Sequence, residues 1–124
     1  MRQRKNLKSL SNAEIVNLFE QLCIEQYDAM EGDEQARVNR LVWRIHDLEM
    51  ELKSRPDDQR YELMRLFGHP NMQVRLSAAQ ANLAVDYASA RREIQAVKDS
   101  QWFPQAGHAG MTLYFLDTGE SKPT

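Results

Sequence analysis

Histidine and carboxylate residues at helical spacing are the first candidates for metal chemistry in this sequence. His46 and Glu49 lie three residues apart, so on a helix they would face the same side. A di-metal helix bundle needs two Glu-x-x-His pairs and further glutamates, whereas this chain has one such pair, in reversed order. The other histidines, His69 and His108, are each isolated in the sequence. We therefore expect a solvated face here, with no metal site.

The single cysteine and a glycine-containing segment are the remaining candidates for catalysis or anion binding. Cys23 lies in an apolar helical stripe with acidic neighbours, whereas a reactive thiolate needs an electropositive site, so we predict a buried structural thiol. The segment 107–110, Gly-His-Ala-Gly, lacks the lysine and the spacing of a phosphate-binding loop, so we predict a tight turn between helices. No Gly-x-Ser-x-Gly nucleophile elbow occurs. We expect no cofactor and no enzymatic activity.

Clusters of charged residues point instead to binding. Seven acidic residues and no lysine or arginine occur between residues 11 and 36. The candidate partner-binding residues are Glu14, Glu25 and Asp28 on one face of the first helix, and Arg37, Arg40 and Arg44 along the second. These faces are either solvated and paired with each other, which adds ~0–1 kcal/mol per exposed pair, or they dock a partner of opposite charge.

Length and net charge limit the class of protein. A chain of 124 residues is sufficient for one domain, and the formal net charge of -2 argues against binding nucleic acid by overall charge. No stretch approaches the ~20 apolar residues of a membrane span, and no apolar run follows the basic start of the chain as in a secretory signal. We expect a cytoplasmic protein with no membrane association.

Apolar spacing predicts the helices that must position these residues. Ser11 and Glu14 form a capping-box pattern at the start of the first helix, which should end near Met30, with Asp33 available to cap the next start. The remaining predicted helices span about 34–55, 57–67, 72–85, 88–100 and 110–117. Val42 and Trp43 are expected to add apolar bulk to the second. No period-two alternation predicts a strand.

One segment has the pattern of a helical repeat. Residues 63–83 contain an apolar helix, a His-Pro-Asn turn, and a second helix that begins Val-Arg and continues Ala-Ala, as in a HEAT-type repeat. Arg75 is placed to reach a carboxylate or carbonyl of the next layer. We predict an all-α fold, a short ARM/HEAT-like α-α superhelix of about three antiparallel helix pairs. It would comprise a flexible basic arm (1–10), one helical domain (11–118) and a tail (119–124).

The chain also resembles, over about residues 11–124, a bacterial family known only as domain of unknown function 2019. The resemblance rests on Leu-Ser-Asn-Ala-Glu at 10–14, on the segment 69–83, and on the ending 103–113. It implies an ARM/HEAT-like fold and brings no catalytic residues.

Two functions follow as hypotheses. The first is a non-catalytic protein-interaction module with an unidentified protein partner, for example a small immunity-type or regulatory binder. The alternative is nucleic-acid binding through basic residues: Arg2, Arg4, Lys5 and Lys8 in the arm, with Arg37, Arg40, Arg44, Arg91 and Arg92. The chain would be a monomer or a weak homodimer, in which Trp102 and Phe103, if exposed, could pair two copies.

Overall fold

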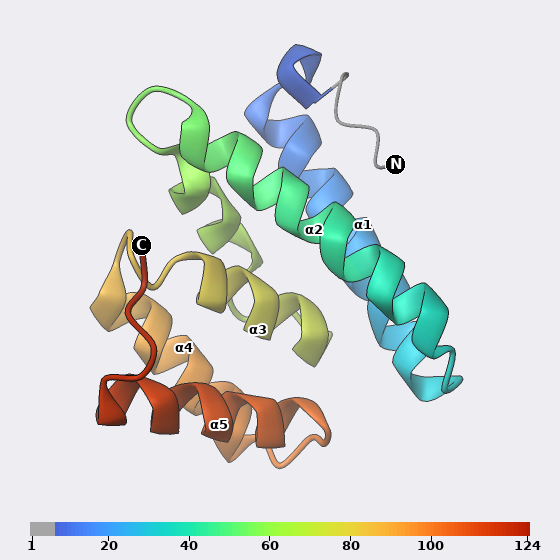
Figure 1. Ribbon diagram of the computed structural model, residues 1–124, viewed down its shortest axis with the longest axis vertical. Helices are drawn as coiled ribbons and strands as arrows, with labels where there is room; N and C mark the ends of the chain where they lie inside the picture. Colours follow the sequence, from blue (N-terminus) through green and yellow to red (C-terminus); the bar gives the residue numbers. More distant parts are fainter. Residues whose placement is uncertain (1–6) are drawn as a thin grey trace. The chain divides into compact units, whose positions relative to one another are not determined.

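The computed structural model describes residues 7–124, and all its regular elements in that range are helices (Figure 1). They are the 3-10 helices η1 (Leu7–Ser9) and η2 (Gln59–Leu66) and the α-helices α1 (Asn12–Glu31), α2 (Gln35–Ser54), α3 (Met72–Ala81), α4 (Tyr87–Asp99) and α5 (Gln105–Thr118). The predicted all-α class is confirmed. Among the described residues, no helix is both long and apolar enough to cross a bilayer. The chain forms two compact units, residues 1–62 and 63–124.

The start of α1 follows the predicted capping box. The Ser11 hydroxyl accepts a hydrogen bond from the Glu14 backbone N–H at 3.1 Å, and the Glu14 carboxylate accepts one from the Ser11 N–H at 2.8 Å. Two backbone donors that the first turn would leave unpaired are thereby satisfied.

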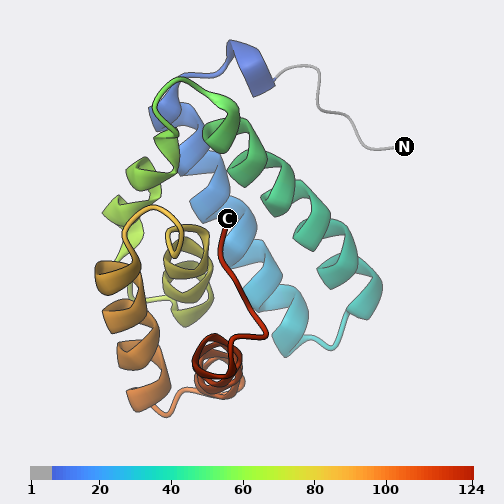
Figure 2. The same cartoon turned by 60° about the vertical axis from the view of Figure 1, so that its left-hand side comes forward.

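The turn between α1 and α2 differs from the prediction. Asp33 does not cap α2; it adopts a left-handed conformation with φ 56°, and Glu34 stands at the cap without a side-chain bond to the helix. Aspartate tolerates this conformation better than most residues, and here it lets the chain reverse within three residues. Figures 1 and 2 show the resulting hairpin, with α1 and α2 side by side and antiparallel.

The apolar stripes of this hairpin form its buried side. Buried residues recur at three- and four-residue steps on both helices: Ile15, Phe19, Leu22 and Cys23 on α1, and Leu41, Ile45, Leu48 and Leu52 on α2. The predicted burial of the Cys23 thiol is thus confirmed.

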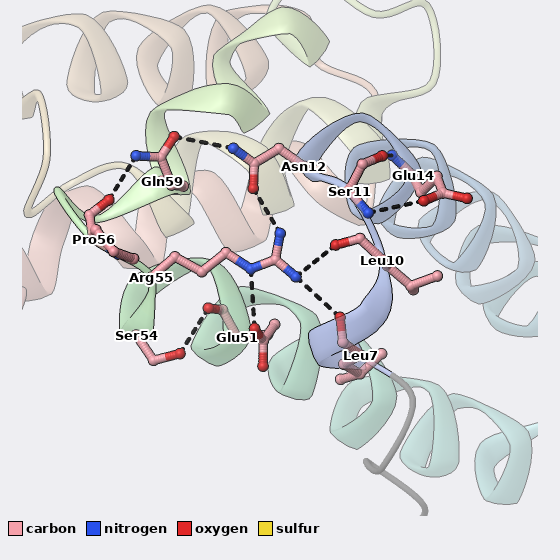
Figure 3. Close-up of polar contacts among 10 residues, drawn as sticks. All are labelled: Leu7, Leu10, Ser11, Asn12, Glu14, Glu51, Ser54, Arg55, Pro56 and Gln59. Atoms are coloured by element: carbon pink, nitrogen blue, oxygen red, sulfur yellow. Dashed lines mark hydrogen bonds and ion pairs between the residues drawn. The ribbon is translucent and has the colours of Figure 1, made fainter.

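The last part of the predicted basic arm, residues 7–10, is held by Arg55 at the end of α2 (Figure 3). The Arg55 guanidinium donates to the carbonyl oxygens of Leu7 at 3.0 Å and Leu10 at 2.8 Å, and to the Asn12 side chain at 2.8 Å. Glu51 accepts from the same guanidinium at 3.0 Å. The arm residues Arg2, Arg4 and Lys5 lie outside the described residues.

In the second unit, α4 contacts both α3 and α5. Its core consists of the buried side chains Leu76, Ala79, Leu83, Ala90, Ile94, Val97, Ala109 and Leu113. Asn71 caps α3 as predicted, since its side chain accepts from the backbone N–H groups of Gln73 and Val74. Arg75 reaches a carboxylate on the next helix, as the repeat pattern suggested: it pairs with Glu93 of α4 at 2.8 Å.

Two boundaries in this unit were predicted wrongly. Helix α3 ends at Ala81 and not near Val85, where non-helical turns lead to Asp86, the cap of α4. Helix α5 begins at Gln105 and not at Gly110, so the segment 107–110 is helical and is not a turn. Gln105, Ala106 and Ala109 are buried, and their burial stabilises the helix across Gly107 and Gly110.

The predicted third helix is confirmed as the 3-10 helix η2. At its start the Asp58 carboxylate accepts a hydrogen bond from the Arg60 backbone N–H at 3.2 Å. The stacking of helix pairs into a superhelix stays a prediction. In the tail, the Ser121 N–H donates to the Phe115 carbonyl at 3.0 Å, and residues 119–124 are exposed.

Candidate partner-binding surfaces

The acidic face predicted on α1 is solvent-facing but is largely engaged in local contacts. Glu14 is tied to Ser11, and the hydrogen bonds from the backbone and side chain of Ser11 lower the pKa of Glu14. Glu25 lies 3.5 Å from the Arg37 guanidinium. Asp28 is exposed. Two of the three acids predicted to bind a partner therefore already serve the hairpin.

The predicted arginine stripe on α2 divides in the same way. Arg37 contacts both Glu25 and Glu34, the latter at 3.3 Å. Arg40 and Arg44 are exposed, and neither has a carboxylate of the described residues within the 4.0 Å of an ion pair. As like charges four residues apart on a helix, they repel each other by about 0.2–0.5 kcal/mol.

Trp43, which was expected to add apolar bulk to the second helix, lies between these two arginines and is exposed. Its side chain is 54% exposed, and its neighbour Val42 is 44% exposed. The imidazole of His46, one turn on, meets the indole edge to face, with ring centroids 6.1 Å apart at 89°. We call the exposed set Arg40, Trp43 and Arg44 the α2 face. It combines a supported aromatic ring with two cations, and Trp and Arg are the residue types that most often dominate binding energy at interfaces.

His46 and Glu49, the pair considered as metal ligands, contact different neighbours. His46 supports Trp43, whereas Glu49 lies 3.8 Å from Arg60, which in turn is held by Asp58 at 2.7 Å. Burial raises the pKa of Glu49, and the nearby Arg60 charge only partly offsets this. Among residues 7–124 no group of three potential metal ligands comes together.

Other ionisable side chains with shifted pKa values also have structural partners. Burial alone would raise the pKa of Glu93, but the hydrogen bonds from Arg75 and from the Gly68 N–H outweigh it, and the pKa is lowered. The hydrogen bond to Glu93 correspondingly raises the pKa of Arg75.

A second exposed surface lies along α5, and of its residues the sequence had indicated only Trp102 and Phe103, as side chains that could pair two copies if exposed. Phe103 is 63% exposed, Met111 57% and Tyr114 61%, and Trp102 beside them is 53% exposed. With Gly107 these residues follow one helix face at steps of four and three, so we call Phe103, Gly107, Met111 and Tyr114 the α5 face. The sequence signal was available, because α5 contains no lysine or arginine and only one acidic residue, Asp117. A predominantly apolar helix is normally buried, yet this one is exposed along one side.

The comparisons with known proteins agree with this fold. A family model described as a domain of unknown function, DUF2019, matches residues 13–117. The chain belongs to this family. The DUF2019 domain is also similar to the crystal structure of the protein RPA1889 from Rhodopseudomonas palustris, with 46% sequence identity and a TM-score of 0.91. That match covers 93% of this chain and 95% of the other. No match was found among curated proteins.

The basic residues considered for nucleic-acid binding do not form one unpaired basic surface among the described residues of this DUF2019 chain: some pair with acids and others lie on separate helices. Arg91 pairs with Asp117 at 2.8 Å, and Arg37 is neutralised by two glutamates. Lys8 and Arg92 are exposed, on η1 and α4 respectively. Of the six candidate partner-binding residues, Asp28, Arg40 and Arg44 thus have the fewest side-chain contacts with the described residues.

Proposed function

We propose that this chain is a non-catalytic, cytoplasmic protein-binding domain whose α2 face binds an acidic segment of a partner protein. The observation that carries the proposal is the pair of exposed arginines, unmatched by carboxylates, on either side of an exposed and supported tryptophan. Complementary charge would steer the encounter, and the indole would supply the apolar anchor.

The proposal that the chain is non-catalytic is supported by the structural origin of the shifted pKa values. Active sites concentrate shifted pKa values in a cleft, whereas Glu49, Asp58 and Glu93 each obtain their shift from burial or from an arginine that holds the fold together. None of them lies on the α2 face.

An acidic partner is a better fit than the basic partner that the acidic face of α1 would suggest. Two of the three acids on that face are held by Ser11 and Arg37, so a basic partner would compete with existing contacts. An acidic partner would instead relieve the repulsion between Arg40 and Arg44.

The test is selection of binders from a random dodecapeptide library displayed on phage, followed by affinity measurements on the enriched peptides. Acidic peptides with an apolar anchor should be enriched, and the double substitution Arg40→Glu, Arg44→Glu should weaken their binding at least tenfold. Arg92→Glu, at an exposed arginine of α4, is the matched control and should leave binding unchanged. Enrichment of peptides without acidic residues would contradict the proposal.

Nucleic acid is the second candidate, because an exposed tryptophan between arginines can also stack on a base beside a phosphate. A 20-base single strand and a duplex of the same sequence are therefore titrated alongside the peptides at low salt. Binding of either that is lost in the double variant, with no acidic peptide enriched, would replace the protein-binding proposal with this one.

A further inference from the structure

The α5 face is a second surface, and it differs from the α2 face in carrying no acidic or basic side chain. Phe103, Met111 and Tyr114 are each more than half exposed, and the one charged residue of the helix, Asp117, pairs with Arg91. We infer that this face pairs with the same face of a second copy of the chain, giving a weak homodimer. The inference does not depend on the proposed binding of an acidic partner.

The exposed area is consistent with a weak dimer. Large side chains of this kind present ~150–250 Å² each, so Trp102, Phe103, Met111 and Tyr114 at these exposures offer roughly 450 Å² of apolar surface. Patches of about 300–600 Å² on monomers are often functional. A standard stable interface buries about 800 Å² per partner, so this smaller surface is suited to a weak, transient dimer.

The lack of charge favours a second copy as the occupant. In a two-fold symmetric contact each residue meets the same surface that it belongs to, so any charged patch would face its own copy. The α5 face avoids that repulsion, and it offers nothing to an acidic or basic partner. The α2 face, with two arginines, would repel itself.

Gly107, which has no side chain, leaves a notch in the α5 face. The bulge that complements this notch is the side chain of Met111, one turn further along the same face. Glycine inside a helix is destabilising relative to alanine, and Gly107 does not have the positive φ that would require it. Packing within the chain does not require it either, because an added Cβ would lie 3.7 Å from the Phe103 ring, an ordinary contact. A second molecule that approaches the backbone at this point would account for the missing side chain.

Helix geometry allows the notch and the bulge to meet. Gly107 and Met111 are one turn apart, about 6 Å along the axis. When two α5 helices run antiparallel about a two-fold axis between these residues, each Met111 lies over the Gly107 of the second copy. Each Tyr114 then lies beside the Phe103–Pro104 corner of the second copy.

The test is sedimentation velocity and light scattering of the full chain from about 10 µM to 1 mM. The mass should rise with concentration from the monomer value of 14.4 kDa toward twice that value. Met111→Glu and Tyr114→Glu should each abolish the rise, because each would bury an unpaired carboxylate against the apolar surface of the second copy. Val42→Glu introduces the same charge at an exposed apolar residue of α2 and should leave the association unchanged.

Gly107→Ala separates dimerisation from folding. It should raise the midpoint of thermal unfolding by about 3–6 °C while weakening self-association about tenfold, since the methyl group fills the notch. A wild-type chain that stays monomeric up to 1 mM, or an association that Met111→Glu leaves intact, would overturn the inference. So would an equal loss in the Val42→Glu control.

Discussion

In each unit of this chain one arginine joins several partners, but in different ways. In the first unit Arg55 at the end of α2 donates to two backbone carbonyls of the segment before α1, to the side chain of Asn12 in α1, and to Glu51 of its own helix. In the second unit Arg75 of α3 makes a two-pronged pair with the Glu93 carboxylate of α4, at 2.8 and 3.0 Å.

The outward surfaces of the two units differ as well. The α2 face presents cations around an aromatic ring, whereas the α5 face presents apolar side chains without charge. The comparison teaches that arginine is structural where carbonyls or carboxylates converge on it, and is available to a partner where they do not.

Glu93→Gln should have the largest effect on stability. The substitution leaves the Arg75 charge, whose side chain is only 19% exposed, without its carboxylate and weakens the bond from the Gly68 N–H. We expect the free energy of unfolding to fall by about 2–4 kcal/mol in urea denaturation. Amide exchange should rise in α3 and α4. A loss below about 0.5 kcal/mol would show that this pair does not secure the second unit.

Arg55→Gln should cost about 2–3 kcal/mol, because the carbonyls of Leu7 and Leu10 and the Glu51 carboxylate lose a charged donor. The effect should be local, with faster amide exchange in residues 7–14 and near the end of α2. Arg44→Gln is the matched control and should leave exchange in these segments unchanged. Exchange that rose equally throughout the chain would contradict a local role for Arg55.

The pH dependence of stability should have opposite signs for Glu93 and Glu49. Because the folded pKa of Glu93 is lowered, its contribution is present above the unfolded value of about 4.5 and is lost as the pH falls through the folded pKa. The deficit of Glu93→Gln relative to wild type should therefore shrink as the pH falls below 4.5, as measured by urea denaturation between pH 3 and 7.

The pKa of Glu49 is raised, so its contribution is present below 4.5 and is lost as the pH rises through the folded pKa. Glu49→Gln should therefore match wild type at low pH and differ from it by less than about 1 kcal/mol at pH 7, in the stabilising direction. Parallel pH profiles for the two glutamine variants would contradict the assigned shifts.

Arg44→Glu should have the smallest effect on stability, but it should clearly weaken the binding of acidic peptides. It replaces a repulsive Arg40–Arg44 pair by an attractive one, so the free energy of unfolding should rise by about 0.3–0.5 kcal/mol. Thermal unfolding measures the first effect and titration with the selected acidic peptides the second. A destabilised variant would show that Arg44 has a structural contact after all.

Local residue patterns were sufficient for much of the fold and for part of the site. The capping box at Ser11 and the Asn71 cap are encoded within a few residues, and both are confirmed. The repeat pattern also predicted that Arg75 reaches a carboxylate, and this is confirmed by its pair with Glu93 on the next helix. The candidate arginines were named correctly as a stripe, but the sequence did not separate Arg37, which is paired, from Arg40 and Arg44. That difference depends on Glu25, twelve residues away and on another helix.

The errors have a common physical origin. Trp43 was expected to add apolar bulk to its helix because it is apolar, and the segment 107–110 was assigned to a turn because it contains glycine. Both predictions used the residue without its surroundings. Burial of Gln105, Ala106 and Ala109 outweighs the low helix propensity of the glycines, which is a tertiary effect.

By itself, the sequence determined that the chain is all-helical and where most helices begin, because caps and apolar spacing act over three or four residues. It also determined which family the chain belongs to. Only the tertiary structure decided which charges are neutralised, that Arg55 orders residues 7–10, and that the α5 face lies open to solvent. These outcomes depend on atoms brought together across tens of residues, where burial and charge pairing are settled by the neighbours that the fold supplies.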